Sequence, residues 1–210
     1  MISNKSSIYF KYFFDVYDGY YLDIGAYDPV HASTTLSLIA QGWTGINIEA
    51  SPKRVKKFYA QRDQQLNVNF AVGKKDEFAT LYEYDFDSSF STISKEVNEY
   101  LINEEKKKPA SQEVTIAELS LKQVCERYFL RKVNYFTLDI EGYGAQVLMG
   151  NDWANPKCRP ELIMSENNKL TVASKLPNMR DFLAEKGYVF LEHLSRNDIF
   201  VLEEMKDYFT

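Results

Sequence analysis

Four acidic residues stand at or near the ends of apolar runs in this chain of 210 residues. Asp23 is the most informative of them, because Gly25 follows closely and Pro29 delays the start of the next helix. A buried strand that ends on Asp-x-Gly is typical of a nucleotide pocket in an open α/β protein, since the glycine lets the backbone approach the ligand and the helix start offers free N–H groups. The other three acids are Glu49, Asp139 and Glu166.

The turn after Asp23 indicates which nucleotide such a pocket would take. A dinucleotide needs a G-x-G-x-x-G turn for its pyrophosphate, but Gly25 is followed by Ala-Tyr-Asp-Pro-Val, and Asp28 would repel phosphate. Glu49, which closes the next apolar run, can accept hydrogen bonds from ribose hydroxyls. These residues favour a cationic, phosphate-free adenosine ligand, which is S-adenosylmethionine, with Asp23 attracting its amino group or its sulfonium.

Asp139 and Glu141 stand where the methyl group of that ligand should point, at the end of a second strongly apolar run. Methyl transfer to a hydroxyl is an in-line displacement that needs an aligned oxygen and a base for its proton. We expect one of these two carboxylates to be the base, because close carboxylates raise the pKa of one of them. Asp139 could instead position the methionine group or the acceptor without proton transfer. His31, in the loop before the first helix, is the rival base.

A divalent metal is the alternative use of these acids. Mg²⁺ and Mn²⁺ prefer carboxylate oxygens, and Asp139, Glu141 and Glu166 could supply them. We do not favour a metal, and activity that survives exhaustive chelation would exclude one.

The elements that must position these acids alternate between strands and helices over the first third of the chain. Apolar runs predict strands over 20–24, 44–48 and 66–72. Capping residues at Ser33-Thr34-Thr35 and Ser51-Pro52 predict the helices between them. This order demands a parallel sheet with right-handed crossovers, which brings the acids to one carboxyl edge, where such sheets bind ligands.

The rest of the chain adds an excursion and a terminal hairpin. We expect an antiparallel strand over 78–84, a loop over 85–94 as a candidate lid, and a charged helix over 96–108. Further strands are expected over 113–116, 133–140 and 161–165, with helices after Ser120, up to Met149 and over 178–186, and with hairpin strands over 188–194 and 198–202. Residues 1–18 would form an N-terminal helical extension.

Composition limits the class of protein. The net charge is -5, so no overall basic field points to a nucleic-acid partner, and the basic clusters over 53–57 and 106–108 are expected on solvated helix faces. Cys125 and Cys158 lack metal-like spacing and suit a reducing compartment. No run approaches the ~20 apolar residues of a membrane span. Lysines at 5 and 11 break any signal peptide, so the expected location is the cytoplasm.

Six segments together resemble the FkbM family of S-adenosylmethionine-dependent methyltransferases. They are DIGAYDP (23–29), GWTGINIEASP (42–52), NVNFAVGKKDEFATLY (67–82), SSFST (88–92), TLDIEGYGAQVLMGNDW (137–153) and RPELIMSEN (159–167). The resemblance implies a class I, Rossmann-like α/β fold. This fold is a three-layer sandwich whose seven-stranded sheet is mostly parallel with an antiparallel last strand, in agreement with the predicted hairpin.

The resemblance also implies roles for individual positions. The cofactor would be bound by the loop after the first strand, by the ribose-binding acid and its neighbour, by a residue near the adenine and by the first acid of an Asp-x-Glu-Gly motif: Asp23, Gly25, Ala26, Tyr27, Glu49, Ala50, Ala71 and Asp139. On the substrate side we expect Asp28, Ser89, Glu166 and Asn167. The chain departs from the family at 27–29, where Asn-Gly often follows Gly-Ala.

The leading hypothesis is an O-methyltransferase that acts on a sugar hydroxyl, such as that of the deoxyhexose rhamnose in a surface glycan. Family members mostly methylate sugars or small natural products, so a small natural product is the nearest alternative. Methylation of nucleic acid or protein is disfavoured, because no Asn/Asp-Pro-Pro-Tyr motif is present around Asp139. A non-catalytic glycan-binding module is disfavoured, because the residues expected to bind the cofactor are all present, including Asp23, Glu49 and Asp139. We expect one domain over 1–210, which could be excised from a larger polypeptide, and the oligomeric state stays open.

Overall fold

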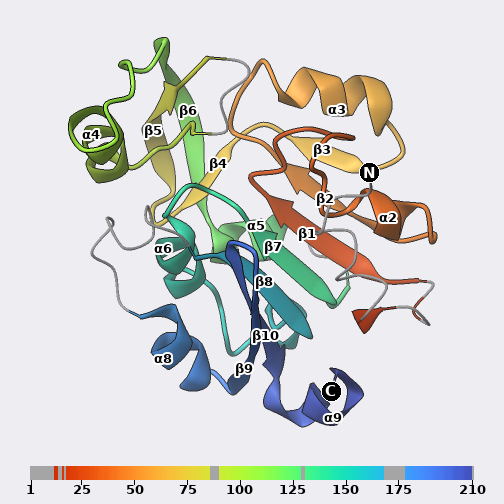
Figure 1. The fold of residues 1–210 in the computed structure, drawn as a ribbon. Coiled ribbons are helices and arrows are strands. Elements are labelled where there is room, and N and C mark those ends of the chain that lie inside the picture. Colours follow the sequence, from red (N-terminus) through yellow and green to blue (C-terminus); the bar gives the residue numbers. More distant parts are fainter. Residues whose placement is uncertain are drawn as a thin grey trace.

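The structure is a computed structural model and describes residues 12–13, 16, 18–85, 90–128, 131–167 and 178–209. Most of the expected N-terminal extension over 1–18 therefore lies outside the described residues, and so does Ser89 in the expected lid. The described residues form two sheets, one of seven strands and one of three (Figure 1).

The larger sheet carries its strands in the order β3-β2-β1-β7-β8-β10-β9. Neighbouring strands run parallel from β3 to β8, and β10 runs antiparallel to both β8 and β9. The predicted seven-stranded, mostly parallel sheet with an antiparallel last strand is thus confirmed. Its strands are β1 (Tyr20–Ile24), β2 (Thr44–Ile48), β3 (Leu66–Val68), β7 (Tyr135–Leu138), β8 (Leu162–Glu166), β9 (Tyr188–Leu194) and β10 (Asn197–Leu202).

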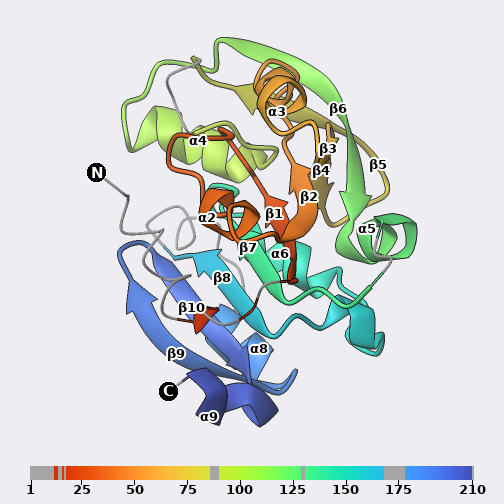
Figure 2. The same cartoon turned by 90° about the vertical axis from the view of Figure 1, so that its right-hand side faces the viewer.

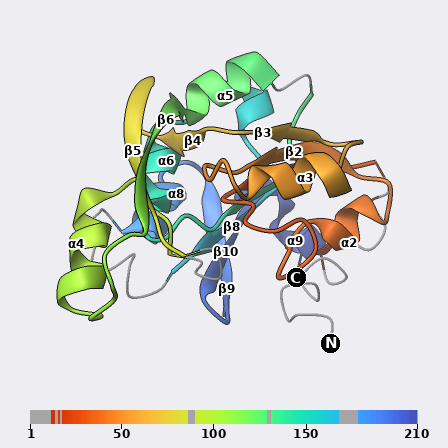
Figure 3. The same ribbon diagram turned by 90° about the horizontal axis from the view of Figure 1, so that it is seen from above.

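Helices cover both faces of this sheet, as strands that are apolar on both sides require. The helices of the described residues are α2 (Leu36–Ile39), α3 (Val55–Gln61), α4 (Lys95–Asn103), α5 (Leu121–Tyr128), α6 (Gly144–Met149), α8 (Met179–Ala184) and α9 (Lys206–Phe209), with 3-10 turns η1 (Pro156–Cys158) and η2 (Glu203–Met205). Of these, α4 packs against the small sheet rather than the large one. Leu22 and Ile24 of β1 pack with residues of α5, α6 and α8, whereas Tyr21 packs with α2 and Trp43. Figure 3 shows α5 and α2 on opposite sides of β2 and β3. The expected three-layer sandwich is confirmed.

The smaller sheet corrects one strand prediction. It consists of β4 (Ala71–Gly73), β6 (Gln112–Ser120) and β5 (Glu77–Glu83), in that order. The prediction of one strand over 66–72 is wrong, because β3 ends at Val68 and β4 pairs with β6 in the second sheet. Asn69 marks the division: its side-chain amide donates to the carbonyl oxygens of Glu49 (2.8 Å) and Ala50 (2.9 Å). These two bonds tie the point between β3 and β4 to the segment that follows β2.

The two sheets lie so that one end of the larger sheet is covered. The small sheet and α4 stand beyond the carboxyl end of β1 (Figure 1), and the hairpin of β9 and β10 forms the opposite border of the molecule (Figure 2). Ser195, with φ 60°, turns this hairpin. The helix expected over 178–186 is shorter, since α8 ends at Ala184, and Gly187, with φ 80°, lies in the turn that follows. In the described part of the chain, no helix is long and apolar enough to cross a membrane.

Candidate active site

A cavity of about 290 Å³ lies where the carboxyl ends of β1, β2 and β7 meet the small sheet. Its size suits a small-molecule ligand, and its place is the one at which open α/β sheets bind ligands. The small sheet and the segment before α4 contribute apolar surface through Leu81 and Ile93. All residues predicted to bind a cofactor line this cavity, together with Glu141: Asp23, Gly25, Ala26, Tyr27, Glu49, Ala50, Ala71 and Asp139.

Gly25 lets the loops after β1 and β7 touch. Its φ of 77° lies in the left-handed region, and a Cβ atom at this position would overlap the carbonyl oxygen of Asp139. The N–H groups of Gly25 and Ala26 donate to the carbonyl of Ile48 at 3.0 and 3.1 Å. Only glycine combines this conformation with so close an approach, so the loop after β1 can lie flat against both neighbouring strand ends.

Asp23 is held by a buried network that the sequence did not reveal. Its Oδ2 accepts a hydrogen bond from the Thr35 hydroxyl at 2.9 Å. Arg62, buried after α3, donates to Thr35 Oγ1 at 2.9 Å and to Asn47 Oδ1 at 3.0 Å, and also to the carbonyl oxygen of Pro29. The guanidinium thus ties the loop between β1 and α2 to β2, and it fixes the orientation of Asp23 through Thr35.

Glu49 is buried and is fixed by main-chain groups on both sides. Its Oε2 accepts from the Tyr27 N–H at 2.8 Å, and its Oε1 accepts from the Ser51 N–H at 2.7 Å. Burial raises the pKa of Glu49, although the nearby Arg54 charge and these two N–H groups act in the opposite direction. Arg54 also lies over the Tyr27 ring, 5.0 Å from its centroid. Each carboxylate oxygen keeps a second lone pair that can accept a hydrogen bond from a hydroxyl group of a ligand.

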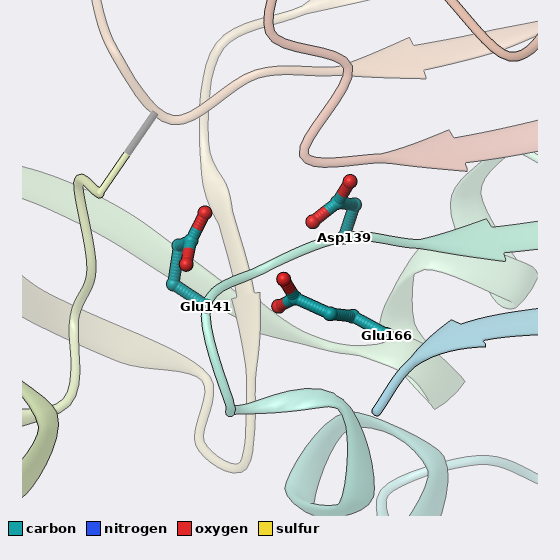
Figure 4. Close-up of side chains that lie close together, drawn as sticks. All are labelled: Asp139, Glu141 and Glu166. Atoms are coloured by element: carbon teal, nitrogen blue, oxygen red, sulfur yellow. The ribbon is translucent and has the colours of Figure 1, made fainter. Parts of the chain in front are cut away.

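Asp139, Glu141 and Glu166 bring three carboxylates together. Asp139 and Glu141 follow β7, Glu166 ends β8, and one oxygen of each lies within 4.8 Å of the others. Figure 4 shows the three side chains converging from adjacent strand ends. A carboxylate that faces a cavity can accept a proton from a hydroxyl, and carboxylate oxygens suit Mg²⁺ or Mn²⁺. The residues therefore fit either a general base or a hard divalent cation.

Three residues of the cavity wall adopt a left-handed backbone without being glycine. They are Tyr27 (φ 59°), Ala32 (φ 55°) and Glu141 (φ 51°). Such conformations cost free energy and persist only where the surrounding structure enforces them, which is common at ligand sites. The Glu141 side chain extends from this turn to the same side of the chain as Asp139 and Glu166 (Figure 4).

Asp28 and His31 are not among the residues that line the cavity. Asp28 is buried and forms an ion pair with Lys57 at 2.6 Å, and its Oδ1 accepts from the N–H groups of Val30 and His31 at 3.0 and 2.8 Å. Burial alone would raise the pKa of Asp28, but the Lys57 ammonium and these N–H groups lower it overall. The carboxylate therefore shapes the loop, and the His31 side chain is exposed to solvent.

Two of the remaining predicted residues lie near the carboxylates rather than on the cavity wall. Glu166 belongs to the acidic cluster, and Asn167 donates its N–H to the Arg196 carbonyl at 2.7 Å and its side-chain amide to Asp198 at 2.9 Å. Ser89 lies outside the described residues.

The sequence prediction missed four side chains at or beside the cavity, which are Arg54, Arg62, Tyr143 and Arg196. Arg54 was expected on a solvated face, but the structure buries it beside Glu49. Burial raises the pKa of Tyr143 to about 12, so its phenol stays neutral. The proximity of Arg54 to Glu49 depends on the fold, and no local pattern indicates it.

The strand order, the reversed β10 and the cavity at the carboxyl edge define a Rossmann-like methyltransferase fold. The family model described as the methyltransferase FkbM domain matches residues 23–190. This chain therefore belongs to the FkbM methyltransferase family, as the six sequence segments indicated. No curated protein matches the chain.

Proposed function

We propose that this methyltransferase uses S-adenosylmethionine and methylates a hydroxyl of a sugar, such as a deoxyhexose in a surface glycan. The observation that carries the proposal is one continuous cavity with the fixed carboxylate of Glu49 on one side and the carboxylates of Asp139 and Glu141 on another. Glu49 suits the hydroxyls of a ribose, whereas Asp139 and Glu141 suit an acceptor hydroxyl whose proton must be removed.

The cavity wall supports a phosphate-free, cationic adenosine ligand. Asp23, Glu49, Asp139 and Glu141 give it four acidic side chains, against the two cations Arg54 and Arg196. Ala71 and Leu81 offer an apolar surface for a flat base. β1 lies between β2 and β7 in the sheet, so Glu49 and Asp139 are two strand spacings apart, or roughly 10 Å. A ligand that reaches from one to the other would cross the Gly25 loop.

S-adenosylmethionine supplies a methyl group that is electrophilic because it is bonded to a sulfonium. In transfer, the acceptor oxygen forms a bond to this carbon while the carbon–sulfur bond breaks. Asp139 or Glu141 accepts the hydroxyl proton, since both carboxylates line the cavity on the side where the acceptor would lie. The apolar residues of the small sheet exclude water from the transfer.

A divalent cation is a second candidate for the acidic cluster, favoured by oxygens within 4.8 Å of one another from three carboxylates. Mg²⁺ or Mn²⁺ held by Asp139, Glu141 and Glu166 would bind and acidify the acceptor hydroxyl. Exhaustive chelation separates the two roles. Activity that persists supports the carboxylate base, whereas activity that is lost and then restored by either ion supports the metal.

Transfer of labelled methyl from S-adenosylmethionine to a panel of glycosides tests the proposal. We expect label on a sugar oxygen with the unchanged chain and with the control Asp63→Asn, whose side chain is exposed after α3. Asp139→Asn should lower the rate by about 100-fold or more, because it removes a positioned base. Label in RNA or protein but in no glycoside would contradict the proposal, and absence of cofactor binding in calorimetry would indicate a non-catalytic module.

A further inference from the structure

Arg196 brings a positive charge to the wall of an otherwise acidic cavity. It lies in the turn between β9 and β10 and is among the lining residues, although much of its side chain is exposed to solvent. The other cation of the wall, Arg54, is buried beside Glu49 and over the Tyr27 ring. In the described part of the chain, no hydrogen bond or ion pair engages the Arg196 guanidinium.

The position of Arg196 in the sheet puts it on the acceptor side. Its neighbour Asn197 pairs with Glu166 across β10 and β8, and the Arg196 carbonyl accepts the Asn167 N–H at 2.7 Å. β10 lies four positions from β2 in the strand order, roughly 19 Å at the usual strand spacing. The backbone of Arg196 therefore lies near the acidic cluster and several strands away from Glu49, where the proposed function puts the ribose.

The turn that carries Arg196 is held from several directions. The ring of His193 contacts the Ser195 carbonyl through Nε2 at 2.9 Å and Asp198 Oδ1 through Nδ1 at 2.7 Å. Asp198 is buried and also accepts from Arg180 Nε at 2.9 Å. A charged side chain on a fixed turn loses less entropy on binding a ligand than one on a mobile loop.

We propose that Arg196 determines acceptor specificity by binding an anionic group, a carboxylate or a phosphate, on the sugar that is methylated. The inference rests on the proposed function. A planar guanidinium with five donors matches either anion in a bidentate geometry. In this arrangement a neutral hydroxyl enters beside Asp139 and Glu141, and the anionic group binds the solvent-exposed Arg196, whose positive charge offsets the neighbouring carboxylates.

Binding of three matched glycosides in the presence of S-adenosylhomocysteine tests the inference by calorimetry. The glycosides are methyl glucoside, its 6-phosphate and methyl glucuronide, so that the two anionic ligands separate phosphate from carboxylate. The unchanged chain should bind at least one anionic glycoside about 10- to 100-fold more tightly than the neutral one, as expected for a charge-assisted hydrogen bond. Arg196→Gln should abolish this preference, and Arg196→Lys should keep part of it.

Arg127→Gln is the matched control, because Arg127 is an exposed arginine of α5 that does not line the cavity. It should keep the full preference for the anionic glycoside. Equal binding of all three glycosides by the unchanged chain would overturn the inference, and so would an Arg196→Gln variant that weakens neutral and anionic glycosides by the same factor. If Arg196-dependent binding is present but no glycoside is ever methylated, the anion site stands and the proposed function fails.

Discussion

Single residues of the cavity are fixed before any ligand arrives. Glu49 accepts hydrogen bonds from two main-chain N–H groups, and Asp23 accepts one from the Thr35 hydroxyl. Gly25 allows the loops after β1 and β7 to touch. Preorganised groups bind a ligand without the entropy cost of ordering side chains. Substitutions at these positions should therefore reduce affinity or stability in ways that depend on the contact each residue makes.

Glu49→Gln should weaken cofactor binding. A glutamine side chain has one acceptor oxygen, so either the Tyr27 N–H or the Ser51 N–H would face an amide NH₂ group. We expect the dissociation constant for S-adenosylmethionine to rise about 10- to 100-fold, as for loss of a hydrogen bond to a charged group. Calorimetry measures it, with the exposed Glu99→Gln of α4 as the control. Unchanged affinity in Glu49→Gln would remove this residue from the binding site.

Gly25→Ala should destabilise the fold itself. The φ of 77° and the overlap with the Asp139 carbonyl oxygen act together, so we expect a loss of about 2 kcal/mol or more in the free energy of unfolding. Gly150→Ala is the matched control, because its φ is -83° and the nearest atoms to an added Cβ lie at 3.4 Å. It should change stability by less than about 1 kcal/mol. Urea denaturation that gives equal losses for both variants would refute the role assigned to Gly25.

At the scale of elements, the small sheet is joined to the main sheet through Glu83 of β5. This buried carboxylate accepts from the Ser51 hydroxyl and from the Gln112 side-chain amide, and it pairs with Lys53 at 3.2 Å. Burial alone would raise the pKa of Glu83, but these partners lower it overall. Ser51 also holds Glu49 through its N–H group, so Glu83 supports the ribose end of the cavity although its own side chain does not line the cavity.

Glu83→Gln should affect cofactor affinity and leave the chemical step unchanged. Loss of the fixed Ser51 hydroxyl should raise the dissociation constant for S-adenosylmethionine roughly fivefold, which corresponds to about 1 kcal/mol. The maximal rate at saturating cofactor should stay the same, because Glu83 is not part of the cavity wall. Glu77→Gln, at the exposed start of the same strand, is the control. A large fall in the maximal rate of Glu83→Gln with unchanged affinity for S-adenosylmethionine would contradict this prediction.

The terminal hairpin should show a pH-dependent contribution from Asp198. Burial tends to raise its pKa, but hydrogen bonds from Arg180, His193 and Asn167 lower the pKa below the ordinary 3.8. A lowered pKa means that the unfolded chain binds the proton more tightly, so the ionised carboxylate stabilises the fold above that ordinary value. This stabilisation is lost as the pH falls through the lowered pKa.

Asp198→Asn should therefore reduce the free energy of unfolding by about 1–3 kcal/mol at pH 7. Urea denaturation of both chains at acid pH measures the difference, which should shrink as the pH falls below about 4. If the difference in the free energy of unfolding instead grew as the pH fell below about 4, the ionised form of Asp198 would not be the one that stabilises the fold.

For the molecule as a whole, the sequence predicts local order better than long-range contact. Asp-x-Gly, the acid after β2 and the Asp-x-Glu-Gly motif locate the cavity, because parallel strands bring their carboxyl ends to one edge. The prediction does not divide β3 from β4, since no glycine or proline interrupts 66–72 and Asn69 acts through bonds to the distant Glu49 and Ala50. Arg196 was missed for the same reason, because only sheet pairing brings the hairpin turn beside Glu166.

A crystal structure of the chain with S-adenosylhomocysteine tests the central claim most directly. We predict that the ribose hydroxyls lie within hydrogen-bond distance of Glu49, that the adenine lies against Ala71, and that the sulfur faces Asp139 and Glu141. A complex in which the adenosine occupies the Asp139 side, or in which the ligand binds outside this cavity, would contradict the proposed arrangement of cofactor and acceptor.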